Sequence, residues 1–91
     1  MNSVVYKYEK WVDDVVSFDL PINAEILHVD LQNGDQRIDL WALVNPDKKK
    51  TEKRTIRIAG TGHPIDPSLK LKYINTFTVE RRLWFHVFEI K

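Results

Sequence analysis

The chain has 91 residues, of which 43% are hydrophobic and 30% are charged, with a net charge of +1 and no cysteine. This length predicts a single domain, residues 1–91, and the hydrophobic content excludes an intrinsically disordered chain. The lack of cysteine excludes disulfide bonds, thiol catalysis and thiolate zinc sites, and it favours the cytosol. No apolar run is long enough to span a membrane, and the first ten residues lack the apolar core of a signal peptide.

The two halves of the chain carry opposite charge. Residues 1–47 contain three basic and nine acidic side chains, whereas residues 48–91 contain eleven basic and four acidic ones. If the halves form separate faces, the asymmetry would steer an anionic partner to one side. If their strands interleave in one sheet, the asymmetry cancels in space.

Short segments of alternating apolar and polar residues dominate the sequence. A period of two is typical of half-buried β-strands, and no window supports a long helix. The pattern predicts about seven strands, at residues 3–10, 14–20, 24–32, 37–44, 54–60, 69–79 and 82–90. Their connections are too short for parallel crossovers. We therefore expect an all-β antiparallel meander that closes as a small sandwich or a flattened barrel.

The connections between these strands carry turn signals. Residues 10–13 are expected to form a tight turn or a bulge. The Asn33-Gly34 pair predicts a hairpin between the third and fourth strands, because both residues tolerate a positive φ. Residues 45–53 combine Asn-Pro-Asp with three consecutive lysines, which predicts a solvated loop. Glu80-Arg81 is the expected tip of the last hairpin.

The segment Gly60-Thr61-Gly62-His63-Pro64 is the strongest candidate for a site. Glycines permit left-handed backbone and close approach of another group, and successive N–H groups in such a turn can bind an anion. Arg57 and His63 would add donors, which suits a phosphate or a nucleotide. The segment lacks the Gly-Lys-Ser/Thr ending of a phosphate-binding loop, and no helix follows it. The alternative is a strand-ending loop whose glycines solve a steric problem.

Other chemistry has less support in the sequence. His28, His63 and His86 fit no local zinc motif, although His28 and His86 could face each other across a sheet, so no metal is predicted. No nucleophile motif surrounds the serines, and carboxylates that point outward from strands are normally solvated, so neither catalysis nor a cofactor is expected. Basic residues between 48 and 57 could contact phosphates, but the acidic first half and a pI near 8.0 disfavour nucleic-acid binding.

Five pieces of the sequence, in order, carry a family resemblance: AEILHVDLQNG, LWALVNPD, EKRTIRIAGTGHPI, YINTF and WFHVFE. They resemble a family of short bacteriophage and prophage proteins of unassigned function, over nearly the whole chain. Asn45 departs from the family's Asp in its LWALVDP piece, and Phe85 is inserted between Trp84 and His86. This insertion predicts that Trp84 and His86 lie on the same face.

The resemblance implies a small β-domain made in the cytoplasm of an infected bacterial host, without a known activity. Together with the lack of catalytic motifs, it leads to a non-enzymatic binding protein that antagonises or redirects a host factor, such as a bacterial immune effector. The contact with a host protein would use an exposed edge strand or an aromatic patch, in a monomer or a homo-oligomer.

Two alternatives remain open. The first is a small-ligand binder that holds a nucleotide or another anion at the Gly60–Pro64 loop, with an aromatic ring stacked on the base. The second is a virion assembly component. The candidate ligand-binding residues are Trp41, Arg57, Gly60, Thr61, Gly62, His63, Trp84 and His86.

Overall fold

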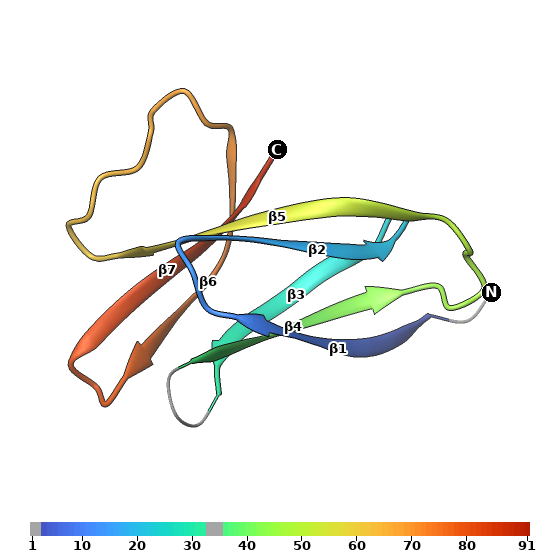
Figure 1. Cartoon of the computed structure of the whole chain (residues 1–91), viewed down its shortest axis with the longest axis horizontal. Helices are drawn as coiled ribbons and strands as arrows, with labels where there is room; N and C mark the ends of the chain where they lie inside the picture. The colour runs from blue at the N-terminus through green and yellow to red at the C-terminus, as the bar shows by residue number, and fades with distance from the viewer. Residues whose placement is uncertain (1–2, 33–35) are drawn as a thin grey trace.

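The computed structural model describes residues 3–32 and 36–91, which form two antiparallel β-sheets packed as a sandwich (Figure 1). The strands are β1 (Val4–Trp11), β2 (Val15–Pro21), β3 (Glu25–Leu31), β4 (Arg37–Val44), β5 (Thr51–Gly60), β6 (Leu71–Val79) and β7 (Leu83–Ile90). The predicted all-β fold with seven antiparallel strands is therefore confirmed, as a sandwich and not as a closed barrel. The described residues contain no helix, and so none that could cross a membrane.

The strand order is more interleaved than a simple meander. The smaller sheet has the order β1-β4-β3 and the larger sheet has the order β2-β5-β7-β6. Residues 12–14 carry the chain from one sheet to the other, so β1 and β2 do not pair. The prediction of a turn or bulge at residues 10–13 is wrong, because β1 continues through Trp11, which pairs with Arg37.

The core lies between the two sheets and follows the alternation of the sequence. In β4 the side chains of Ile38, Leu40, Ala42 and Val44 are all buried, as their period of two predicts. They meet buried residues of β2, β5 and β7 on the facing sheet. Full burial of each large aliphatic side chain stabilises the fold by about 1.5–3 kcal/mol.

Two of the predicted turns can be compared with the structure. Glu80 and Arg81 have φ angles of 53° and 56° and form the tip between β6 and β7, which confirms that prediction. The loop at 45–53 is shorter than predicted, because its last three residues, 51–53, pair with residues 19–21 of β2. Their charged side chains suggested a loop, yet the backbone pairing continues. The Asn33-Gly34 turn lies outside the described residues.

The two sheets meet along a seam between the edge strands β3 and β6. At its midpoint the side-chain amide of Asn75 bonds both backbone groups of Val29. Each strand has a register irregularity beside this contact, at Leu27 in β3 and at Ile74 in β6. Asn75 therefore holds the seam closed at one point and leaves a cleft on either side of it.

The charge asymmetry of the sequence is divided between the sheets. All three strands of the smaller sheet come from the acidic half, whereas β5, β6 and β7 come from the basic half. Only β2 crosses from the acidic half into the larger sheet. The halves thus form mostly separate sheets, which is the first of the two alternatives considered above.

Candidate functional site

Aromatic and hydroxyl side chains occupy the outer face of β6 and β7. We call this surface the aromatic face; it consists of Tyr73, Thr76, Thr78, Trp84, His86 and Phe88. These residues alternate with the buried Phe77 and Val87, so they point away from the core. The side chains of Tyr73 and Trp84 are 56% and 52% exposed, and the Tyr73 ring meets the Phe88 ring edge-on at 5.7 Å.

A chain of hydrogen bonds crosses the aromatic face. The Thr61 hydroxyl lies 2.7 Å from Nε2 of His86, and Nδ1 of His86 lies 3.1 Å from the Thr76 hydroxyl. The Tyr73 hydroxyl is 2.7 Å from that same Thr76 oxygen. The chain links the Gly60–Pro64 loop to β7 and β6, so it fixes the side chains of this surface in one arrangement.

The outer face of the smaller sheet carries more charge, although Trp11 and Trp41 also lie on it. Its three strands place Glu9, Asp39 and Asp30 in one row. Arg37 bonds Glu9 at 3.1 Å, and Lys7 lies 3.8 Å from the same carboxylate. Protein interfaces are depleted in charge at their centre and enriched in aromatic residues. Of the two outer faces, the aromatic face has the composition of a contact surface.

Asp39 is a buried carboxylate on the charged face. It is 1% exposed, and its Oδ1 has no hydrogen-bond partner among the described residues. Burial raises the pKa of the Asp39 carboxyl; Lys7 opposes this rise, whereas Glu9 and Asp30 add to it. The assumption that outward carboxylates are solvated is therefore wrong here, because the side chains of both flanking strands cover Asp39.

The Gly60–Pro64 loop is a tight turn whose donors are largely used. The His63 N–H donates to the Gly60 carbonyl at 3.0 Å, and the Thr61 N–H donates to the Trp84 carbonyl at 3.2 Å. The His63 ring lies against Gly60, where a Cβ would come within 3.0 Å of it, and Gly62 has a φ of 86°. This geometry favours the steric role of the glycines over an anion-binding concavity.

The remaining candidates fall into two separate places. Arg57 donates to the backbone carbonyls of Ile58 and Pro64, so its guanidinium fastens the loop to β5. Thr61, Trp84 and His86 lie together on the larger sheet, and Trp84 shares its face with His86 as predicted. Trp41 lies on the other sheet, with its ring 5.7 Å from that of His28.

The structure separates the histidines. His28 belongs to the outer face of the smaller sheet and His86 to the outer face of the larger sheet, so the two do not face each other across one sheet. Within residues 3–32 and 36–91, no three His, Cys, Asp or Glu side chains lie close enough together to hold a metal ion.

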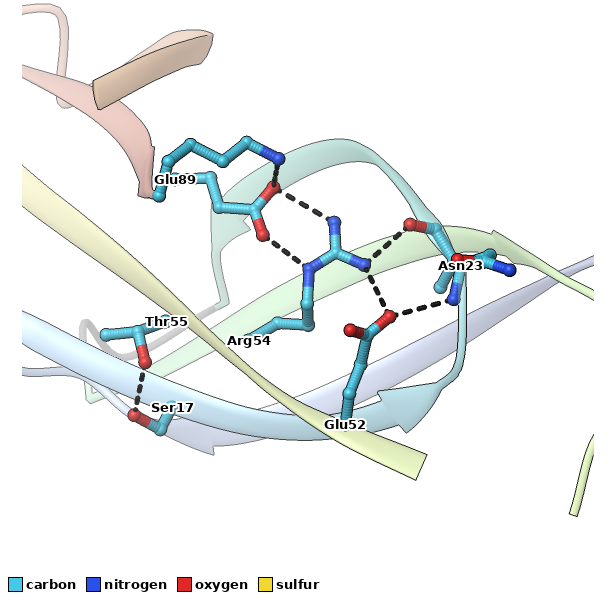
Figure 2. Close-up of polar contacts among 8 residues, drawn as sticks. Ser17, Asn23, Glu52, Arg54, Thr55 and Glu89 are labelled. Carbon is cyan, nitrogen blue, oxygen red and sulfur yellow. Dashed lines mark hydrogen bonds and ion pairs between the residues drawn. The ribbon is translucent and has the colours of Figure 1, made fainter. Parts of the chain in front are cut away.

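A buried ion-pair network lies on the inner face of the larger sheet (Figure 2). Arg54 on β5 forms a two-point pair with Glu89 on β7, with Nη2 and Oε1 3.0 Å apart, and donates from Nη1 to the Ala24 carbonyl at 2.8 Å. Glu52 Oε2 lies 3.6 Å from Arg54 Nη1 and accepts the Asn23 N–H at 2.8 Å. The hydrogen bond from Arg54 lowers the pKa of Glu89, against the effect of burial.

Sequence reasoning missed this network. In the sequence, Arg54 is one of the basic residues between positions 48 and 57, and nothing there predicts its pairing with Glu89. Its alternation with Ile56 and Ile58, both buried, would have placed it on the inner face. A charge at an inward position is expected to be paired, because an unpaired buried charge is very costly.

Hollows in the described part of the chain border the Arg54–Glu89 pair, the Gly60–Pro64 loop and Trp84. A polar cleft of about 700 Å³ lies over the Arg54–Glu89 pair, on one side of Asn75. An apolar cleft of about 360 Å³ lies on the other side and is bordered by Gly60 and His63. A notch of about 170 Å³ lies between the Gly60–Pro64 loop and Trp84.

One comparison with known proteins finds a relationship. A family described as "Domain of unknown function (DUF7352)" matches residues 1–91. No curated protein and no solved structure matches the chain. Function is therefore inferred from the residues and contacts described above.

Proposed function

The chain belongs to the DUF7352 family of domains of unknown function, and we propose that it is a non-enzymatic binding protein whose aromatic face docks on a host protein. In this proposal the domain is encoded by a bacteriophage or prophage and acts in the cytoplasm of the infected bacterium. It antagonises or redirects a host factor, such as a bacterial immune effector. The resemblance of its five sequence pieces to phage proteins supports this setting.

The observation that carries the proposal is the composition of the aromatic face. Although 30% of the chain is charged, none of its six residues is Lys, Arg, Asp or Glu. Antiparallel sheets usually present polar residues on a face that meets only water. The mixture of rings and hydroxyls resembles a non-obligate interface more than the strongly apolar interface of a permanent dimer.

The rim of this face indicates the chemistry of the partner. Leu83 and Trp84 are exposed at the start of β7, and Arg82 lies beside them at the notch. Tryptophan and arginine are the residue types most often found at energetic centres of interfaces. We infer a partner surface with an apolar group that meets Trp84 and a carboxylate that meets Arg82.

Affinity capture from bacterial lysate with matched variants tests this function. Trp84→Ala on the aromatic face is compared with Trp11→Ala on β1. Trp11 is 63% exposed on the outer face of the smaller sheet, and the Arg37 guanidinium lies 4.7 Å from the centre of its ring. A host protein retained by the unmodified chain and by Trp11→Ala, but reduced about tenfold or more with Trp84→Ala, supports the proposal.

Three outcomes would contradict it. One is equal retention by both variants. Another is the recovery of a second copy of the chain alone, which would make the face a homo-oligomer contact. The third is co-purification with virus particles, which would support an assembly role. Native mass spectrometry of the purified protein separates these outcomes by mass.

The nucleotide or anion alternative has one observation in its favour. The notch beside the Gly60–Pro64 loop contains Arg82, a cation that sequence reasoning did not include. Against it, two loop N–H groups and the Arg57 guanidinium are already bonded within the chain. A small molecule released on denaturation in the same mass measurement would favour this alternative over protein docking.

A further inference from the structure

The apolar cleft beyond Asn75 has the shape of a small-molecule site. Buried Ile58 and Phe77 line it, and the rings of Phe77 and Phe85 stack with centroids 5.5 Å apart. Leu31 and Val79 form its sides, from β3 and β6. A volume of about 360 Å³ lies within the usual range for ligand pockets, which are mostly apolar with a few polar groups.

Two acidic residues that are exposed to solvent line this cleft, and we call this part of it the mouth. They are Asp13 and Asp14, and the described residues that line the cleft include no lysine or arginine. The Asp14 N–H donates to Asp13 Oδ1 at 2.7 Å, and the Ile58 N–H donates to the Asp14 carbonyl at 2.8 Å. These bonds hold the Asp13 carboxylate and the backbone of Asp14, so the linker is positioned on β5 before any ligand arrives.

The guanidinium of Arg57, which lies beside this pair, does not bond either carboxylate. The Arg57 guanidinium bonds the Ile58 and Pro64 carbonyls and approaches only the carbonyl of Asp14, at 3.5 Å. Neither acidic side chain takes part in an ion pair within the described part of the chain.

His63 closes another side of the mouth. Its ring lies on Gly60, because a glycine leaves the space that a Cβ would fill. The ring adds a flat wall and a hydrogen-bonding group to the border of the cleft. Gly60 and His63 therefore border this apolar cleft and do not form the anion-binding turn that their sequence suggested.

We propose that this cleft binds a small organic cation, an amine whose aromatic or aliphatic body enters the apolar interior. Its ammonium group then meets the carboxylates of Asp13 and Asp14. The acidic mouth disfavours an organic anion of the same size by like-charge repulsion. None of the six residues of the aromatic face lines the cleft, although Leu83 at the rim of that face does, so this site is adjacent to the proposed protein contact but distinct from it.

The test titrates the ¹⁵N-labelled full chain with tryptamine and, separately, with indole-3-acetate. The two probes share one ring system and carry opposite charges. We expect tryptamine to produce saturable shifts at the amides of Leu31, Ile58 and Phe77, which line the cleft and not the notch, with an affinity at least about tenfold above that of indole-3-acetate. Since both probes are applied to the unmodified chain, this comparison needs no variant.

Variants then assign the charge effect to the mouth. The double change Asp13→Asn and Asp14→Asn is expected to weaken tryptamine binding at least about fivefold, whereas Asp19→Asn, an exposed carboxylate on β2, leaves it unchanged. Equal affinities for the two probes, no saturable shift at the cleft amides, or shifts confined to the aromatic face would each overturn the proposal.

Discussion

The side chain of Asn75 makes the two backbone hydrogen bonds to Val29 that a neighbouring strand would otherwise make. Its Oδ1 accepts the Val29 N–H at 2.8 Å, and its Nδ2 donates to the Val29 carbonyl at 2.8 Å. One amide therefore satisfies both backbone groups at the edge of β3, where Val29 itself is fully buried. An edge strand that lacks such a partner would leave buried polar groups unbonded, which is costly.

We predict that Asn75→Ala destabilises the fold by roughly 2–4 kcal/mol, because two backbone groups lose their partners. Urea denaturation at neutral pH measures this loss. Asn45→Ala is the matched control, since the side chain of Asn45 accepts an exposed N–H, that of Asp47. A loss below about 1 kcal/mol for Asn75→Ala would show that the seam does not depend on this amide.

Glu89→Gln should reduce stability by about 3 kcal/mol at neutral pH, because Arg54 would remain buried without its carboxylate. The pKa of Glu89 is lowered in the folded state by the Arg54 hydrogen bond. Its stabilisation is therefore complete above the ordinary glutamate pKa and is lost as the pH falls through the lowered folded value.

The difference between the unmodified chain and Glu89→Gln should accordingly shrink on acidification, as measured by urea denaturation at a series of pH values. Glu52→Gln serves as the control, since the side chain of Glu52 is much more exposed and accepts from Asn23 at the surface. A difference that stays constant with pH would contradict the assigned role of the ion pair.

Asp39→Asn should have the opposite pH dependence. The pKa of Asp39 is raised in the folded state by burial, so its stabilisation is complete below the ordinary aspartate pKa and is lost as the pH rises through the raised value. At pH 7 the variant should be more stable than the unmodified chain, by an amount on the order of 1 kcal/mol. Thermal melts should show this advantage disappearing in acid; an unchanged advantage would contradict it.

Trp41→Ala should cost about 1–2 kcal/mol, because Trp41 is only half buried, on the outer face of β4 beside His28. A tryptophan inside the core would cost about 3–5 kcal/mol. Chemical denaturation distinguishes the two values. A loss in the higher range would place the ring in the core.

Alternation along the sequence predicts the inner face of β4 but not that of β3, where the irregularity at Leu27 exposes this residue and packs Ile26 against the core. The four buried residues of β4 and the common face of Trp84 and His86 both follow from a period of two. The hairpin tip at Glu80-Arg81 followed from the short spacing between two strands, and both residues adopt the positive φ that such a turn needs.

Strand order could not be predicted in the same way. Pairing of β1 with β4, and of β2 with β5, depends on packing between segments that are distant in sequence. For the same reason, sequence analysis grouped Trp41 with Trp84, although the two rings belong to different sheets. The long-range bonds of Asn75 to Val29 and of Arg54 to Glu89 have no local signal.

Site-specific photo-crosslinking in bacterial cells tests whether the aromatic face contacts another protein. A benzophenone amino acid replaces Tyr73 on the aromatic face or, as the matched control, Tyr6 on β1, whose side chain is 46% exposed. We predict one prominent crosslink to a host protein from position 73 and none from position 6. Equal crosslinking from both positions, or crosslinking from position 6 alone, would contradict the assignment of this face.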